Sequence, residues 1–145
     1  MNQAAPHHAK EARSIHFAEV LMARESITPK DAGCQSYLIY RLQKLGFSCT
    51  KHKVNGVTNL IARWGHGPLH FAFSGHTDVV PASAKEWSSD PFVATQRNNK
   101  VYGRGSTDMK GFIACSLALA PYFSTQNLEM QTKLRALRSS PTALQ

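Results

Sequence analysis

The sequence predicts an α/β fold, in which helices pack on a sheet of short strands. Two observations indicate this class. Stretches with helical spacing of apolar residues stand before and after a group of strand-like segments, and polar residues directly follow one of those segments. The chain has 145 residues, of which 42% are hydrophobic. This length suffices for one domain with a real core and is too short for two ordinary domains.

Two helices are expected in the first third of the chain. Residues 9–24 place apolar side chains at helical spacing. The second helix is expected to begin at Thr28, a favoured N-cap residue type, with Pro29 at the first helical position. Asp31 would then lie close to free backbone N–H groups, where its negative charge is stabilising. Gly46 should end this helix.

Short strands should follow the second helix. Residues 69–73 form an apolar run of the kind found in a covered central strand. Strands are also expected at residues 47–54 and 59–64, together with a hairpin over residues 92–101 that turns at Asn98 and Asn99.

The last expected helix begins near Asp108 and ends at Pro121, because proline cannot donate to the helical ladder. In an α/β fold such a helix should lead into another strand, yet residues 124–145 contain no strand-like run. The sequence therefore predicts that residues 1–128 are the N-terminal part of a larger domain. Residues 129–145 would be an atypical tail, added by a frameshift or a splice.

Composition excludes several classes of function. The formal net charge is +8, but the basic residues are scattered and form no run, which argues against nucleic-acid binding. No apolar stretch approaches the roughly 20 residues that span a bilayer, and the first residues lack the apolar core of a signal peptide. The three cysteines, Cys34, Cys49 and Cys115, form no CxxC pair. We therefore expect a cytoplasmic protein without a disulfide framework or a thiolate zinc site.

The candidate functional residues lie in two motifs. Residues 74–81 read SGHTDVVP and follow a predicted strand, where α/β folds place their ligands. His76 could bind a metal ion through one ring nitrogen, and the Asp78 carboxylate could accept a hydrogen bond from the other. Residues 102–111 read YGRGSTDMKG, and Asp108 could bridge two metal ions. The alternative interpretation is structural: a His at a strand end, an Asx turn at Asp78 and an ordinary helix cap at Asp108.

Taken together, the two motifs favour the metal-binding interpretation over the structural one. Residues 71–115 closely resemble the metal-dependent aminoacylase/carboxypeptidase (M20) family of dizinc amidohydrolases. The resemblance extends over about residues 14–128. Its further matching pieces are SITP at residues 26–29, LGF at 45–47, Asn59-Leu60, and Trp87 followed by DPF at 90–92. Two long motifs in this order, about 30 residues apart, are specific for the family.

The resemblance implies a zinc-peptidase-like α/β catalytic domain, present here as its N-terminal part and without the family's inserted dimerisation domain. His76 would bind one metal ion, Asp108 would bridge two, and Asp78 would orient His76. The metal ions would be zinc, with cobalt as a substitute. Intact family members would act as homodimers on small acyl-amino acids, with no membrane or nucleic-acid partner.

The implied reaction is hydrolysis of the amide in N-succinyl-LL-diaminopimelate to succinate and LL-diaminopimelate, a step of lysine and diaminopimelate biosynthesis. The alternatives are a related deacylase, such as one acting on acetylornithine, or a non-catalytic remnant that binds metal or a partner. The family takes its general base and another ligand from a Glu-Glu pair beyond the helix at Asp108. Only Glu129 is acidic after Asp108. The chain by itself is therefore expected to be inactive.

Overall fold

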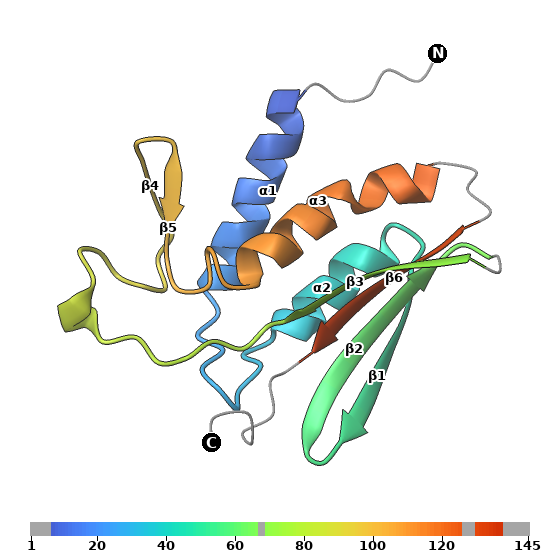
Figure 1. Ribbon diagram of the computed structural model, residues 1–145, viewed down its shortest axis with the longest axis horizontal. Helices are drawn as coiled ribbons and strands as arrows, with labels where there is room; N and C mark the ends of the chain where they lie inside the picture. Colours follow the sequence, from blue (N-terminus) through green and yellow to red (C-terminus); the bar gives the residue numbers. More distant parts are fainter. Residues whose placement is uncertain (1–6, 67–68, 126–129, 138–145) are drawn as a thin grey trace.

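The computed structural model describes residues 7–66, 69–125 and 130–137. In this part of the chain, helices lie along one side of a twisted sheet, and a small hairpin projects beside them (Figure 1). The predicted α/β class is confirmed. None of the described helices is long and apolar enough to cross a membrane.

The main sheet has the strand order β1-β2-β6-β3. Strands β1 (Ser48–Val54) and β2 (Val57–Trp64) form an antiparallel hairpin. Its turn is Asn55-Gly56, where both residues have positive φ, as such tight turns require. Strand β6 (Met130–Leu137) lies antiparallel to β2 and parallel to β3 (Leu69–His76).

Three helices of the described residues form the layer beside this sheet. They are α1 (His7–Met22), α2 (Cys34–Gln43) and α3 (Lys110–Thr125). Buried apolar side chains of all three helices and of β2 belong to one core, which includes Leu21, Leu38, Leu60, Ala62 and Leu117. This core holds β2, α1 and α3 together, and the end of β3 and the loop before α3 carry the candidate site residues.

The remaining described elements lie between β3 and α3. They are the short 3-10 helix η1 (Ala84–Glu86) and the antiparallel strands β4 (Thr95–Arg97) and β5 (Lys100–Tyr102). Asn98 and Asn99 form the turn, and both have positive φ. The predicted hairpin and its turn are thus confirmed. The first predicted helix and the stop at Gly46, whose φ is 83°, are confirmed as well.

The predicted start of the second helix is wrong. The helix begins at Cys34, and Thr28 does not cap it, because Ile27 forms a parallel bridge with Val79 and keeps this segment extended. Left-handed backbone at Ala32 and Gly33, with φ of 48° and 79°, also prevents a continuous helix from Pro29. Asp31 keeps its expected role, since its carboxylate accepts the backbone N–H of Gln35 at 3.1 Å.

Two further expectations are corrected. Strand β3 extends to His76 and lies at an edge of the described sheet rather than in its centre, and Phe71 on it is 46% exposed. Helix α3 continues past Pro121 to Thr125. A proline inside a helix costs about 3 kcal/mol, so tertiary contacts must offset it. One such contact joins the rings of Phe123 and Phe73, whose centroids are 5.9 Å apart.

The expectation that no strand follows residue 124 is also wrong, because β6 occupies residues 130–137. The expectation overlooked an alternation in this segment: Met130, Thr132, Leu134 and Ala136 stand between the polar residues Gln131, Lys133 and Arg135, which is the period of a strand. The strand also has a partner on each side, β2 and β3. That residues 129–145 derive from a frameshift or a splice stays a prediction, and residues 138–145 lie outside the described part.

Candidate metal centre

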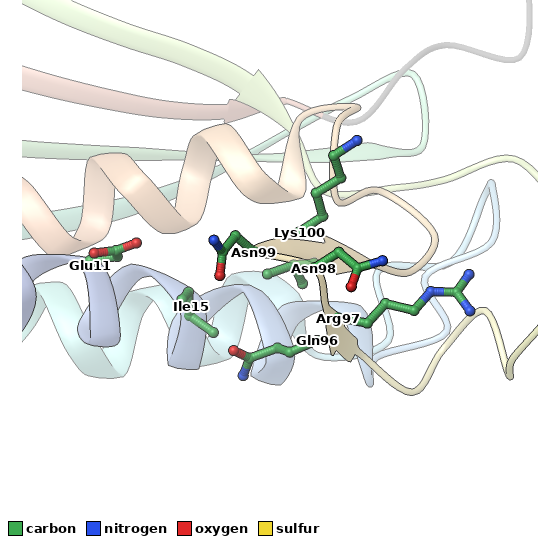
Figure 2. A pocket seen from close by; sticks show the side chains of 8 residues that line it. Glu11, Ile15, Gln96, Arg97, Asn98, Asn99 and Lys100 are labelled. Atoms are coloured by element: carbon green, nitrogen blue, oxygen red, sulfur yellow. The ribbon is translucent and has the colours of Figure 1, made fainter.

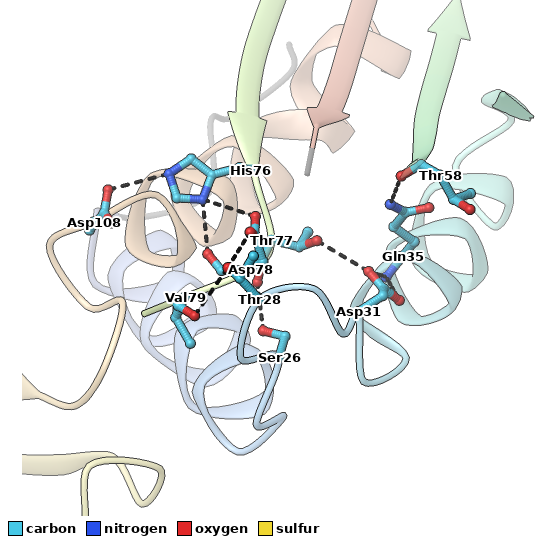
Figure 3. A network of polar contacts seen from close by, with 10 residues as sticks. All are labelled: Ser26, Thr28, Asp31, Gln35, Thr58, His76, Thr77, Asp78, Val79 and Asp108. Carbon is cyan, nitrogen blue, oxygen red and sulfur yellow. Dashed lines mark hydrogen bonds and ion pairs between the residues drawn. The ribbon is translucent and has the colours of Figure 1, made fainter. Parts of the chain in front are cut away.

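The three predicted site residues lie together at the carboxyl end of β3 (Figure 3). His76 is the last residue of the strand, Asp78 follows it in the chain, and Asp108 lies in the loop before α3. His76 Nε2 is 3.5 Å from Asp108 Oδ1, and His76 Nδ1 is 3.5 Å from Asp78 Oδ1. The imidazole therefore stands between two carboxylates, one on each side.

The hydrogen bond at Nδ1 indicates which tautomer the His76 ring adopts. Nδ1 lies 2.9 Å from the backbone carbonyl oxygen of Asp78. A carbonyl oxygen can only accept, so Nδ1 carries the proton and donates. In the neutral ring, Nε2 then has a free lone pair that faces the Asp108 carboxylate. Two acceptors that face each other repel unless a proton or a cation lies between them.

The spacing of this pair suits a shared cation. Two ligand atoms that each lie about 2.0–2.2 Å from one zinc ion at the tetrahedral angle are about 3.4 Å apart. The observed separation between His76 Nε2 and Asp108 Oδ1 is 3.5 Å. The Asp108 side chain is 71% exposed, so a metal ion can reach it from solvent. His and Asp thus fit as two ligands of a divalent metal ion. No group of three potential ligands occurs among the described residues.

Asp78 behaves differently from Asp108. It is 1% exposed, and its Oδ2 accepts a hydrogen bond of 2.6 Å from the Thr28 hydroxyl. We predicted that its carboxylate would accept the His76 N–H, but the closer acceptor is its backbone carbonyl, with the carboxylate at 3.5 Å. Both acceptors favour the tautomer in which Nδ1 carries the proton. The role assigned to Asp78 stays a prediction.

Segment 26–28 positions the loop that carries Asp78. The Ser26 hydroxyl donates to the Thr77 carbonyl at 2.6 Å, and the Val79 N–H donates to the Ser26 carbonyl at 2.9 Å. The Thr28 N–H donates to the Val79 carbonyl at 3.0 Å. Asp31, just before α2, makes a further hydrogen bond to this loop, because its carboxylate accepts the Thr77 hydroxyl at 3.1 Å. The loop after His76 is therefore held on several sides.

The loop before α3 positions Asp108 through close backbone packing. A β-carbon added at Gly111 would lie 2.0 Å from the Ser106 carbonyl oxygen, so only glycine fits there. The Gly111 N–H donates to the Gly105 carbonyl at 3.1 Å, which closes the loop on itself. Met109 adopts a φ of 62°, a conformation that is uncommon for a residue other than glycine.

Lys110 anchors the same loop to the segment that follows α1. Its side chain is fully buried, and Nζ donates to the carbonyl oxygen of Arg24 at 2.7 Å. Burial lowers the pKa of Lys110, and the adjacent Cys34 thiol is foremost among the groups that oppose the shift. Lys110 therefore has a structural role in holding this loop.

A hollow of about 390 Å³ lies away from these residues, between α1 and the β4–β5 hairpin (Figure 2). Its lining comes from Glu11, Ile15 and residues 96–101, so His76 and the two aspartates take no part in it. Arg104, the other cation of the second motif, lies over the Trp87 ring at 5.2 Å and donates to the Pro81 carbonyl. The hollow is therefore separate from the candidate metal centre.

Residues 72–137, which include His76, Asp78, Asp108 and β6, match the family model described as Peptidase family M20/M25/M40. Over these residues, the chain is similar to the M20 family.

Curated relatives of this chain carry the name succinyl-diaminopimelate desuccinylase. The relative from Alteromonas mediterranea, "Succinyl-diaminopimelate desuccinylase 1", is 68% identical over 111 residues, which are 76% of this chain and 28% of the relative. The relative from Bordetella parapertussis is 45% identical over 127 residues, 87% of this chain and 34% of the relative. The chain thus spans about a third of the length of these relatives.

Solved structures confirm the expected zinc-peptidase-like fold. Human carnosine dipeptidase 1 superposes with a TM-score of 0.78 at 24% identity and covers 90% of this chain, which corresponds to 33% of that protein. The M20 metallo-carboxypeptidase Sso-CP2 of Sulfolobus solfataricus gives a TM-score of 0.74, also at 24% identity, over 85% of this chain and 30% of its own.

Sequence reasoning missed two residues of this site. Thr28 was expected to cap a helix, although the residue before a proline favours extended backbone, and that signal fits the observed bridge between Ile27 and Val79. The partner of Lys110 is a backbone carbonyl 86 residues away, for which the sequence holds no signal.

Proposed function

We propose that this chain is part of a metal-dependent amide hydrolase that converts N-succinyl-LL-diaminopimelate to succinate and LL-diaminopimelate. The observation that carries the proposal is the pair His76 Nε2 and Asp108 Oδ1, 3.5 Å apart inside the segment that matches the M20 model. The named desuccinylases among the relatives support the choice of substrate.

In this proposal His76 and Asp108 would hold zinc, with cobalt as a substitute, and Asp108 would also serve a second ion. The chemistry supplied by bound metal would be polarisation of the scissile carbonyl and a lowered pKa of a water molecule. The protein's own contribution is to hold the His76 ring with its Nδ1 proton on the Asp78 carbonyl, so that Nε2 stays available. The reaction adds one water across the amide, so the carbonyl carbon gains the hydroxyl and the leaving nitrogen gains a proton.

We further propose that the 145 residues alone do not turn over substrate. A general base contributes about 10²–10⁴ in rate. After Asp108 the only acidic residue is Glu129, so no Glu-Glu pair follows α3 in this sequence. The homodimer implied by the resemblance and the cytoplasmic location expected from the composition stay predictions.

A chimera tests the substrate directly. The 111 matched residues of the Alteromonas mediterranea relative would be replaced by their counterparts from this chain, which are 68% identical. We expect the chimera to release succinate from N-succinyl-LL-diaminopimelate with zinc or cobalt, and the same chimera with His76→Ala to release none.

Three outcomes would contradict parts of this proposal. A folded chimera that cleaves acetylornithine but not the succinyl substrate would indicate the related deacylase. A folded chimera that binds zinc and cleaves neither substrate would favour the non-catalytic remnant. Succinate release by the 145-residue chain on its own would overturn the proposed inactivity.

A further inference from the structure

Segment 26–28 runs alongside the loop that follows His76. Both ends of the segment, Ser26 and Thr28, make hydrogen bonds to this loop. Ile27 and Val79 form a parallel bridge, flanked by the hydrogen bonds from Val79 N–H to the Ser26 carbonyl and from Thr28 N–H to the Val79 carbonyl. These are backbone bonds, which any residue other than proline at position 28 can make. The Thr28 hydroxyl is the part of this segment that reaches the Asp78 carboxylate (Figure 3).

The hydroxyl has two acceptors within reach and one proton to donate. Asp78 Oδ2 lies 2.6 Å away, and the Val79 carbonyl lies 3.4 Å away. The shorter distance and the charged acceptor both favour the carboxylate. The Thr28 hydroxyl therefore donates its hydrogen bond to the Asp78 carboxylate.

This hydrogen bond sets the orientation of the carboxylate. Asp78 is 1% exposed, so its two oxygens lie in fixed surroundings rather than in water. With Oδ2 held by Thr28, the other oxygen, Oδ1, faces His76 Nδ1 at 3.5 Å. The negative charge beside Nδ1 favours the tautomer in which Nδ1 carries the proton and Nε2 is free to bind metal.

We propose that Thr28 is a positioning residue for the metal centre and acts on His76 through the Asp78 carboxylate. The inference rests on the proposed metal-binding role of His76. It adds a residue about 50 positions upstream of the site, outside both motifs and outside the segment that matches the M20 model.

The test compares Thr28→Val with Ser26→Ala in the full 145-residue chain. Thr28→Val keeps the size of the side chain and the backbone hydrogen bond from residue 28 to the Val79 carbonyl, but it removes the hydroxyl that reaches Asp78. Ser26→Ala is the matched control, because it removes a buried hydroxyl bond of 2.6 Å to the same loop without touching the carboxylate. Urea unfolding measures the stability of each variant, and competition with a chromophoric chelator measures its zinc affinity.

We expect Thr28→Val to weaken zinc binding about tenfold, the lower end of the range for groups that orient a metal ligand. Thr28→Ser should restore most of the affinity, because it returns the hydroxyl. Ser26→Ala should lose stability but keep its zinc affinity. The ¹⁵N shifts of the His76 ring in the metal-free protein should move in Thr28→Val and stay in place in Ser26→Ala.

Equal zinc affinities and unchanged His76 ¹⁵N shifts in wild type and Thr28→Val would overturn the proposal. Equal losses in Thr28→Val and Ser26→Ala would do so too, since the role would then be structural. If wild type and His76→Ala bind zinc alike, the proposed metal site fails, and the ¹⁵N shifts still decide the role of Thr28. Should Thr28→Val not fold, Thr28→Cys supplies a weaker donor, and an affinity equal to that of Thr28→Ser would refute the inference.

Discussion

Replacing Gly111 by alanine sets two effects of opposite sign against each other. Gly111 is the second residue of α3, and glycine in a helix interior is about 0.5–1 kcal/mol less favourable than alanine. Helix propensity alone therefore predicts a more stable protein. The added β-carbon, however, would lie 2.0 Å from the Ser106 carbonyl oxygen, about 1 Å closer than the shortest contacts that real β-carbons make.

The steric effect should dominate. The opposing atom belongs to the backbone, so the loop from Gly105 to Gly111 must shift as a whole. Overpacking of this kind costs about 1–3 kcal/mol and occasionally more. Taking the upper value of about 3 and subtracting a helix gain of about 1 leaves a net loss of about 2 kcal/mol. Because Asp108 lies in this loop, zinc affinity should fall as well.

Urea unfolding of Gly111→Ala, with Gly56→Ala as a control, measures this loss. Gly56 has a φ of +78°, and a β-carbon there would meet nothing within 4 Å. The control therefore carries backbone strain of about 1–2 kcal/mol without a clash and leaves the Asp108 loop in place. A Gly111→Ala protein as stable as wild type, with undiminished zinc affinity, would refute the close packing of this loop.

Three other predictions concern the buried residues Leu38 and Cys34. Leu38 is fully buried, so Leu38→Ala should lower the free energy of unfolding by about 2–5 kcal/mol in urea, and a loss below about 1 kcal/mol would contradict its place in the core. Burial raises the pKa of the Cys34 thiol, whereas Cys115 is exposed, so a thiol reagent at pH 8 should label Cys115 in the native protein and Cys34 only after unfolding. Because the unfolded Cys34 thiol ionises at a lower pH than the folded one, its contribution to stability should be lost as pH rises from its ordinary pKa through the raised value. Rapid native labelling of Cys34 would contradict both statements.

The parts of the fold that the sequence predicted are those with local causes. The hairpin turn at Asn98 and Asn99 depends on residue types that tolerate positive φ, and these can be read from two adjacent positions. The placement of His76 at a strand end follows from the apolar run before it. The helix after Asp108 likewise begins within two residues of its expected start.

Most of the parts that escaped prediction depend on partners far away in the sequence. Strand β6 is the exception, because residues 130–136 alternate with the period of a strand and this local signal was overlooked. Lysine is almost never fully buried, and the burial of Lys110 depends on the carbonyl of Arg24, which follows α1 in the chain. Thr28 has an N-cap residue type, but its hydroxyl donates to Asp78, so the same local pattern served a different contact.

The most direct test of the central claim is a zinc titration of wild type against His76→Ala and Asp108→Asn, each checked for folding by circular dichroism. If His76 Nε2 and Asp108 Oδ1 share a cation across their 3.5 Å separation, each substitution alone should abolish the binding that wild type shows. The ¹⁵N signal of His76 Nε2 in wild type should shift as zinc is added. Equal zinc binding by all three folded proteins, with the Nε2 signal unmoved, would contradict the account.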